Sequence, residues 1–246
     1  MNLLAIDTAS EKFSVALAAQ RQGGRDTWLF EIDAGMRHSE LAMDCAGELA
    51  RKAGLEPGDI GGVACMGGPG SFTGLRIGFS LAKGLSLSLG VPFAAIPTLD
   101  CLARPLSAWP GIAVPALDAK KKAFFCALYR GGGKIGGDMD ASPREIALAI
   151  AGGLSRLEAG EPERALVFGP GAELLCRELA LLPGGDPGVD RAKAAVRLGK
   201  GIRWGNAETL LEMALEARLF EKGAGNPPAG PEYIRKSDAE INLGAP

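Results

Sequence analysis

The chain has 246 residues, of which 47% are hydrophobic and 23% are charged, and its formal net charge is −2 at pH 7. This apolar content supports a fully folded protein of one large or two small domains, and the charge balance gives no broad basic surface for nucleic acid. The five cysteines are widely spaced and form no CxxC pair, which argues against a zinc site or a disulfide framework and favours reduced thiols in the cytoplasm.

Two segments of the sequence argue against a secreted protein and against a membrane-spanning protein. The opening "MNLLAIDTASEK" is too short and too acidic for a signal peptide. Residues 73–89 are interrupted by Arg76 and Lys83 and are rich in Gly and Ser, so they are not expected to span a membrane. The sequence therefore predicts a soluble cytoplasmic protein.

The first predicted elements are two strands joined by a polar turn. The segment "LLAID" (residues 3–7) is typical of a buried strand, "TASEK" of a turn and "FSVALAA" (residues 13–19) of a second strand, with Asp7 at the end of the first. A helix is predicted next over residues 38–53. Its apolar residues recur at four-residue steps and predict one buried face: Leu41, Cys45, Leu49 and Ala53.

A glycine-rich segment follows, "MGGPGSFTGLRIGFSLAKG" (residues 66–84). An apolar strand leads into a Gly-Pro-Gly turn, and a helix is predicted over residues 73–89. Small residues fall at four-residue steps along two rows of this helix, Gly74–Gly78–Ala82 and Ser80–Gly84–Ser88. Because each glycine inside a helix costs about 1 kcal/mol relative to alanine, a close approach of another backbone is expected to offset that cost.

The sequence repeats this organisation in its second half. Residues 117–128, "LDAKKKAFFCAL", align without a gap on residues 6–17, "IDTASEKFSVAL", and Asp118 falls opposite Asp7. An apolar strand, a second Gly-Pro-Gly turn and a helix start follow in "ALVFGPGAELL" (residues 165–175). Repetition on this scale predicts an α/β protein of two duplicated lobes, with mixed sheets flanked by helices.

The predicted domains follow from the repeat. Residues 1–105 form the first lobe and residues 106–205 a reduced second lobe, with a hinge expected near Pro105 to Pro115. A helix predicted over residues 206–223, with Asn206 as N-cap and Gly223 as C-cap, is expected to pack back on the first lobe. Residues 223–246 are rich in Pro and Gly and predict an extended arm.

A glycine-rich turn at a helix start is one way to hold a phosphate. The residues that would line such a nucleotide cleft are Asp7, Thr8, Ser10, Gly68, Gly70, Ser71 and Asp118. However, Pro69 has no N–H to donate and the turn lacks the lysine of a P-loop. The pattern therefore favours a vestigial cleft, or simply a tight strand-to-helix turn, over a working phosphate site.

The sequence gives little support for catalysis. Its only histidine is His38, so neither a metal site with two histidines nor a recognisable Ser–His–Asp arrangement can be assigned. We therefore predict no catalytic and no metal-binding residues. The alternative is an ATP-dependent enzyme of the kinase-like or glycoprotease-like type, in which Asp7 would hold a metal–nucleotide between the lobes.

Association between helices is the remaining hypothesis. The small-residue rows of residues 73–89 are explained equally well by packing inside the lobe and by a face shared with a partner. On the second explanation, this helix and the apolar stripe of residues 38–53 form a docking face. Gly78→Leu or Leu81→Asp is then expected to abolish pairing while leaving the monomer folded.

Five segments, in order, resemble one protein family: "LLAIDTASEKFSVAL", "RHSELAMD", "GGPGSFTGLRIGFSLAKGL", "VPFAAIPTLDCLA" and "LDAKKKAFFCALY". They are similar to the TsaB (YeaZ) family over about the first 130 residues. The third segment is typical of that family and of its paralogue TsaD. The resemblance implies a two-lobed fold of the actin-like, sugar-kinase-like type.

The resemblance also implies a function. TsaB members are non-catalytic scaffold and activating subunits of the complex that forms N6-threonylcarbamoyladenosine next to the anticodon of tRNA. The expected partners are a TsaD-like transferase, a TsaE-like ATPase and, in isolation, a second copy of the chain, with tRNA contacted only indirectly. No intrinsic cofactor is expected, and ATP or ADP would be present only in the complex.

The family's docking face is made by the helices that match residues 37–52 and 72–89. The resemblance thus assigns the partner interface to residues on these two helices: Arg37, Leu41, Cys45, Leu49, Gly74, Ile77, Gly78, Leu81 and Leu85.

Overall fold

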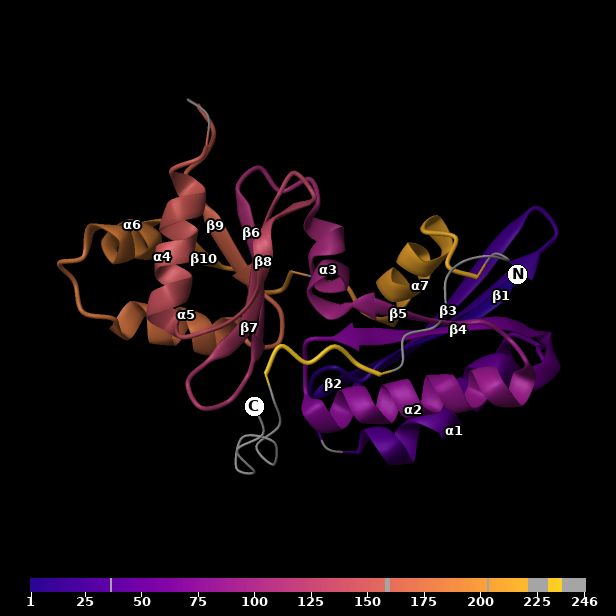
Figure 1. Cartoon of the computed structure of the whole chain (residues 1–246). Helices are drawn as coiled ribbons and strands as arrows, with labels where there is room; N and C mark the ends of the chain where they lie inside the picture. The colour runs from indigo at the N-terminus through magenta and orange to yellow at the C-terminus, as the bar shows by residue number, and fades with distance from the viewer. Residues whose placement is uncertain (36, 158–159, 203, 221–229, 236–246) are drawn as a thin grey trace. The chain divides into compact units, whose positions relative to one another are not determined.

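The computed structural model describes residues 1–35, 37–157, 160–202, 204–220 and 230–235 (Figure 1). The chain divides into two compact units. Unit 1 consists of Met1–Cys101 together with Gly205–Pro246, and unit 2 consists of Leu102–Trp204. Among the residues described, no helix has the length and apolar character that crossing a bilayer requires.

Unit 1 is built on a mixed five-stranded sheet with the order β3-β2-β1-β4-β5. The first three strands form an antiparallel meander, and the last two run parallel to β1. The strands are β1 (Asn2–Asp7), β2 (Lys12–Arg21), β3 (Gly24–Asp33), β4 (Ile60–Gly68) and β5 (Phe93–Pro97).

Helices cover both faces of this sheet (Figure 1). Strand β1 alternates, so that Leu4 and Ile6 contact the core beneath α1 and α2 while Leu3 and Ala5 contact the core beneath α7. The helices are α1 (His38–Lys52), α2 (Phe72–Leu89), the short α3 (Thr98–Ala103) and α7 (Ala207–Glu216), with a 3₁₀ turn at Pro57–Asp59.

Unit 2 repeats the same topology. Its sheet order, β10-β9-β6-β7-β8, is that of unit 1 read from the other edge, with a meander of three antiparallel strands followed by two parallel ones. The strands are β6 (Ile112–Asp118), β7 (Phe124–Arg130), β8 (Gly133–Ala141), β9 (Ala165–Phe168) and β10 (Val196–Leu198). The predicted α/β fold of two duplicated halves is therefore confirmed.

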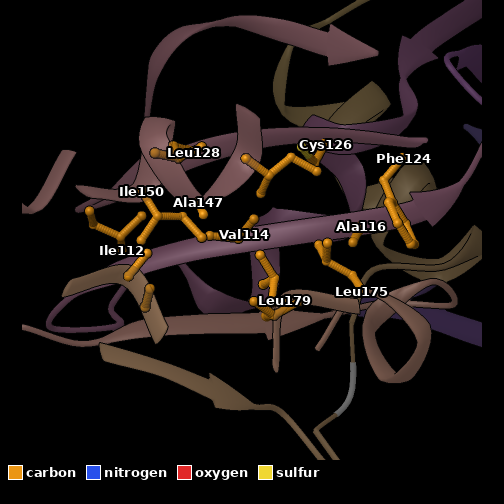
Figure 2. Close-up of a cluster of buried hydrophobic side chains, with 14 of the residues drawn as sticks. Ile112, Val114, Ala116, Phe124, Cys126, Leu128, Ala147, Ile150, Leu175 and Leu179 are labelled. Carbon is orange, nitrogen blue, oxygen red and sulfur yellow. The ribbon is translucent and has the colours of Figure 1, made fainter. Parts of the chain in front are cut away.

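The core of unit 2 lies between this sheet and its helices (Figure 2). Figure 2 shows Val114 and Ala116 of β6 together with side chains of the helices α4 (Pro143–Leu154) and α5 (Ala172–Leu181). Helix α6 (Pro187–Ala195) contributes to the same core, and a 3₁₀ turn lies at Arg104–Leu106. Helix α4 begins with a reciprocal capping box, in which Ser142 and Glu145 each accept from the other's backbone N–H.

Most predicted helix boundaries agree with the structure, and one does not. Asn206 caps α7 as expected, its side chain accepting from the Glu208 N–H at 3.0 Å. The helix ends at Glu216, however, well before the predicted residue 223. The chain turns there through Arg218, whose φ is +52°, and the Leu219 N–H donates to the Ala214 carbonyl. Gly223 lies outside the described residues, as does most of the predicted arm 223–246.

Candidate functional site

The first Gly-Pro-Gly turn is closed by hydrogen bonds within unit 1. The Gly68 N–H donates to the Thr98 hydroxyl at 3.2 Å, and the Ser71 N–H donates to the Ala9 carbonyl at 2.7 Å. The Ser71 hydroxyl then caps α2 by accepting from the Gly74 N–H. The turn that connects β4 to α2 is thus held in place by hydrogen bonds from its own backbone N–H groups.

The turn between β1 and β2 packs directly on this glycine turn. The Asp7 carboxylate accepts from the Ala9 N–H at 2.9 Å, and the Thr8 hydroxyl donates to the Gly74 carbonyl at 2.7 Å. A Cβ placed on Gly70 would lie 2.6 Å from the Ala9 carbonyl oxygen, so only glycine allows this approach. Three backbone N–H groups of these two turns, at Ala9, Gly68 and Ser71, therefore already donate within the chain.

The predicted cleft residues are thus brought together in part. Asp7, Thr8, Gly68, Gly70 and Ser71 meet, but in a packed contact and not in an open phosphate cradle.

The remaining two predicted cleft residues make other hydrogen bonds. The Ser10 hydroxyl accepts from the Lys12 N–H instead. Asp118 belongs to unit 2, where it accepts from the Lys120 N–H at 2.7 Å in the equivalent turn. Nearby, the Gly171 N–H of the second Gly-Pro-Gly turn donates to the Ala116 carbonyl, so that turn is also held by a backbone hydrogen bond, although between other positions than in unit 1.

Asp7 is the most perturbed carboxyl group of this region. Burial raises its pKa from 3.8 to about 7, against the opposing hydrogen bond from Ala9, and the charge of Glu31 adds to the increase. The unfolded chain therefore releases this proton above about pH 4, whereas the folded protein keeps it until about pH 7. Folding stability is lost as the pH rises through that window.

Asp7→Asn is expected to remove this loss, because Asn keeps an oxygen that can accept from Ala9 and carries no charge. At pH 8 the variant should be more stable than the wild type by about 4 kcal/mol, and at pH 4 the difference should largely vanish. Urea unfolding of both proteins at several pH values measures the effect. Parallel pH profiles for the two proteins would contradict it.

The inner small-residue row of α2 faces the chain's own β1–β2 turn. A Cβ on Gly74 would clash with the Thr8 carbonyl oxygen, and one on Gly78 would clash with the Thr8 hydroxyl. Both glycines and Ala82 are buried. The predicted close approach is present, and for Gly74 and Gly78 it is made to the chain's own Thr8, so Gly78→Leu would disturb folding before pairing. Their assignment to a partner interface stays a prediction.

The apolar stripe of α1 also faces inward. Cys45 and Leu49 are buried in the core between α1, α2 and the sheet, so in this chain they pack inward, and their assignment to a partner interface stays a prediction. Leu41, Leu81 and Leu85 are partly buried against the same core. These side chains recur at helical spacing because they cover the sheet.

The outward side of α2 is open in unit 1. We define the α2 outer face as Thr73, Ile77, Ser80, Gly84, Leu87 and Ser88, of which all but the half-buried Ile77 are exposed. Leu87 is 75% exposed, and Gly84 has no atom within 4 Å of its missing Cβ. The second predicted row of small residues lies on this face. On the neighbouring α1, Arg37 is exposed and Met43 is 49% exposed.

Sequence reasoning missed the contact that the segment 230–235 makes with the glycine turn. The Glu232 N–H donates to the Gly67 carbonyl at 2.7 Å, and its backbone runs so close to Gly68 that a Cβ there would clash. The Tyr233 ring lies 5.0 Å from that of Phe72, at the start of α2. The one sequence feature that could have indicated this contact is Tyr233, an aromatic residue in a tail that is otherwise rich in Pro and Gly.

His38, the only histidine, serves packing. Its buried ring meets Phe13 edge-on at 6.2 Å, and burial lowers its pKa. Within the part of the chain that the structure describes, no three His, Cys, Asp or Glu side chains are grouped so that they could hold a metal ion.

Comparison with known proteins places this architecture in a family. Residues 32–167, more than half of the chain, match the family model of TsaD, described as tRNA N6-adenosine threonylcarbamoyltransferase. The chain belongs to this family. Its similarity to curated TsaB proteins confirms the predicted TsaB (YeaZ) type of member.

Two such relatives are both named tRNA threonylcarbamoyladenosine biosynthesis protein TsaB. The protein of Bacillus subtilis strain 168 is 33% identical over 132 residues, which are 53% of this chain and 56% of the relative. That of Escherichia coli strain K12 is 34% identical over 134 residues, 53% of this chain and 55% of the relative. The chain thus spans about half the length of the curated TsaB relatives it matches.

A solved TsaB-type structure shares the fold along nearly the whole chain. YeaZ from Pseudomonas aeruginosa aligns with a TM-score of 0.66 and 23% identity, covering 95% of this chain and 99% of that one. At this identity the likeness concerns the fold, and it agrees with the actin-like duplication predicted from the sequence.

Proposed function

We propose that this chain is a non-catalytic docking subunit in the formation of N6-threonylcarbamoyladenosine on tRNA, and that it binds a TsaD-like transferase through the α2 outer face. The names of the TsaB relatives and of the matching family support the pathway. A TsaE-like ATPase joins the pair, and the free chain pairs with itself through the same face. The complex acts in the cytoplasm and holds ATP or ADP only when assembled.

The observation that carries the proposal is the contrast between the two sides of α2. The inner side closes on Thr8 and leaves the glycine turn packed. The outer side exposes Leu87 beside small residues, which allow another helix backbone to approach closely. Gly84 is exposed to solvent and lies in the middle of α2, where glycine costs about 1 kcal/mol of helix stability relative to alanine. A partner that packs closely against this position would account for a glycine there.

Co-elution tests the proposal. The chain and a TsaD-like transferase, mixed at micromolar concentration, should elute together in size-exclusion chromatography with light scattering, at the mass of a heterodimer. Separate elution at every ratio tested would contradict the docking role.

The raised pKa of Asp7 favours one competing function, because active-site carboxyls are often perturbed in this way. On that alternative the isolated chain is an ATP-dependent enzyme. Calorimetry with ATP and magnesium distinguishes the two. Binding by the isolated chain that disappears in Asp7→Ala would favour the enzyme, and no heat of binding is expected for a docking subunit.

A further inference from the structure

We infer that Arg76 is the anchor that binds a carboxylate of the partner at the edge of the α2 outer face, and that Tyr233 positions it. The inference rests on the proposed function and adds the chemistry by which this face selects its partner. It also gives a role to the segment 230–235.

The Arg76 guanidinium is held by two aromatic rings. Its Cζ lies 3.8 Å from the centre of the Phe72 ring and 5.9 Å from that of Tyr233. Its Nε donates to the Tyr233 hydroxyl at 3.2 Å. Stacking of this kind fixes the plane of a guanidinium and lowers the entropy that is lost when the group binds a ligand.

The clamp itself is anchored to the body of unit 1. Tyr233 follows Glu232, whose N–H is bonded to the Gly67 carbonyl and whose backbone passes over Gly68. Phe72 is the first residue of α2, one turn before Arg76. The rings of Phe72 and Tyr233, which form the clamp around Arg76, are therefore both positioned by the turn that starts α2. The guanidinium is thus held in a defined direction.

The charge of Arg76 is uncompensated within the described residues. Its acceptor at Nε is the hydroxyl of Tyr233 and not a carboxylate, and neither an ion pair nor any other hydrogen bond involves the Arg76 side chain in that part of the chain. Helix α2 contains no Asp or Glu, and its only charged residues are Arg76 and Lys83. The exposed guanidinium therefore keeps its two terminal nitrogens for an external acceptor.

The chemistry of that acceptor follows from the shape of the group. A planar guanidinium offers two parallel N–H donors, which match the two oxygens of a carboxylate. Thr73 and Ser80 of the outer face lie one turn away on either side of Arg76. We therefore assign the occupant as an Asp or Glu side chain of the transferase that docks on α2. Arginine and tyrosine are also the residue types that most often dominate binding energy at interfaces.

The test compares variants of the full chain for affinity to the TsaD-like transferase by calorimetry. Arg76→Lys keeps the charge but loses the two parallel N–H donors and the stacking on the aromatic rings, and it should weaken binding at least about tenfold. Tyr233→Phe keeps the ring and loses the hydroxyl, so a loss of about threefold is expected. Lys83→Ala removes an exposed, unstacked cation from the same helix and should change affinity less than about twofold.

The salt dependence of the affinity provides a second readout, because a purely apolar contact of Arg76 would not make binding sensitive to salt. Wild-type affinity should fall between about 50 and about 300 mM salt, and the slope should be smaller for Arg76→Ala. Thermal melts check that each variant is folded. If Arg76→Lys does not fold, Tyr233→Phe and the wild-type salt titration still decide.

Three results would overturn the inference: Arg76→Lys binding like the wild type, Lys83→Ala losing as much as Arg76→Lys, or a wild-type affinity independent of salt. All three leave the docking function intact, because the wild type still binds the transferase in each. Failure of the wild type to bind the transferase at all would remove the proposed function together with the inference.

Discussion

Replacing Gly74 by alanine is expected to destabilise the protein by about 2–4 kcal/mol, whereas the same change at Gly84 should stabilise it by about 0.5–1 kcal/mol. Gly74 lies in the first turn of α2, and Gly84 lies in its interior. An added Cβ at Gly74 would overlap the backbone carbonyl oxygen of Thr8, which cannot rotate away, while at Gly84 it would enter open space. Urea unfolding of the two variants measures the difference.

The paired design separates helix propensity from packing. Alanine is a better helix former than glycine, so a loss of stability at Gly74 can come only from the contact with Thr8. Equal changes in the free energy of unfolding would contradict the assignment of the inner row to the core of unit 1.

Leu87→Asp is expected to abolish pairing with the transferase and leave the folded chain intact. Because Leu87 is 75% exposed, the change should alter stability by less than about 0.5 kcal/mol. A charge placed within the proposed close-packed interface, however, should lower affinity at least about a hundredfold. Calorimetry with the transferase and a thermal melt of the free variant measure the two effects.

The matched control lies in unit 2. Leu181, at the end of α5, is 73% exposed, so Leu181→Asp makes the same chemical change at the same exposure on another surface. It should bind the transferase like the wild type. Equal losses in both variants, or none in either, would show that the α2 outer face is not the docking face.

The elements of the fold could be predicted from the sequence because they follow local rules. The alignment of Asp118 on Asp7 and the two Gly-Pro-Gly turns predicted the duplication, and helical spacing predicted α1 and α2 almost to their ends. The predicted end of α7 was wrong, because the chain turns at Arg218 and brings Leu219 and Phe220 against the sheet. That is a tertiary contact with no local signal.

The candidate surface was predicted less well, for a physical reason. Spacing shows that Cys45, Leu49 and Gly78 share faces of their helices, but a face turned to the chain's own sheet and a face turned to a partner have the same pattern. Only the burial of Cys45 and the contact of Gly78 with Thr8 show that these residues pack inward in this chain. The Arg76 clamp depends on Tyr233, which is distant in sequence, so no local pattern could predict it.

Reconstituted tRNA modification tests the central claim most directly. The rate of threonylcarbamoyladenosine formation should be measured with the transferase, the ATPase and tRNA, adding in turn no chain, the wild type, Leu87→Asp or Asp7→Asn. A docking subunit predicts modification with the wild type and with Asp7→Asn, and almost none with Leu87→Asp or without the chain. Full activity without the chain, or activity that survives Leu87→Asp and is lost in Asp7→Asn, would contradict it.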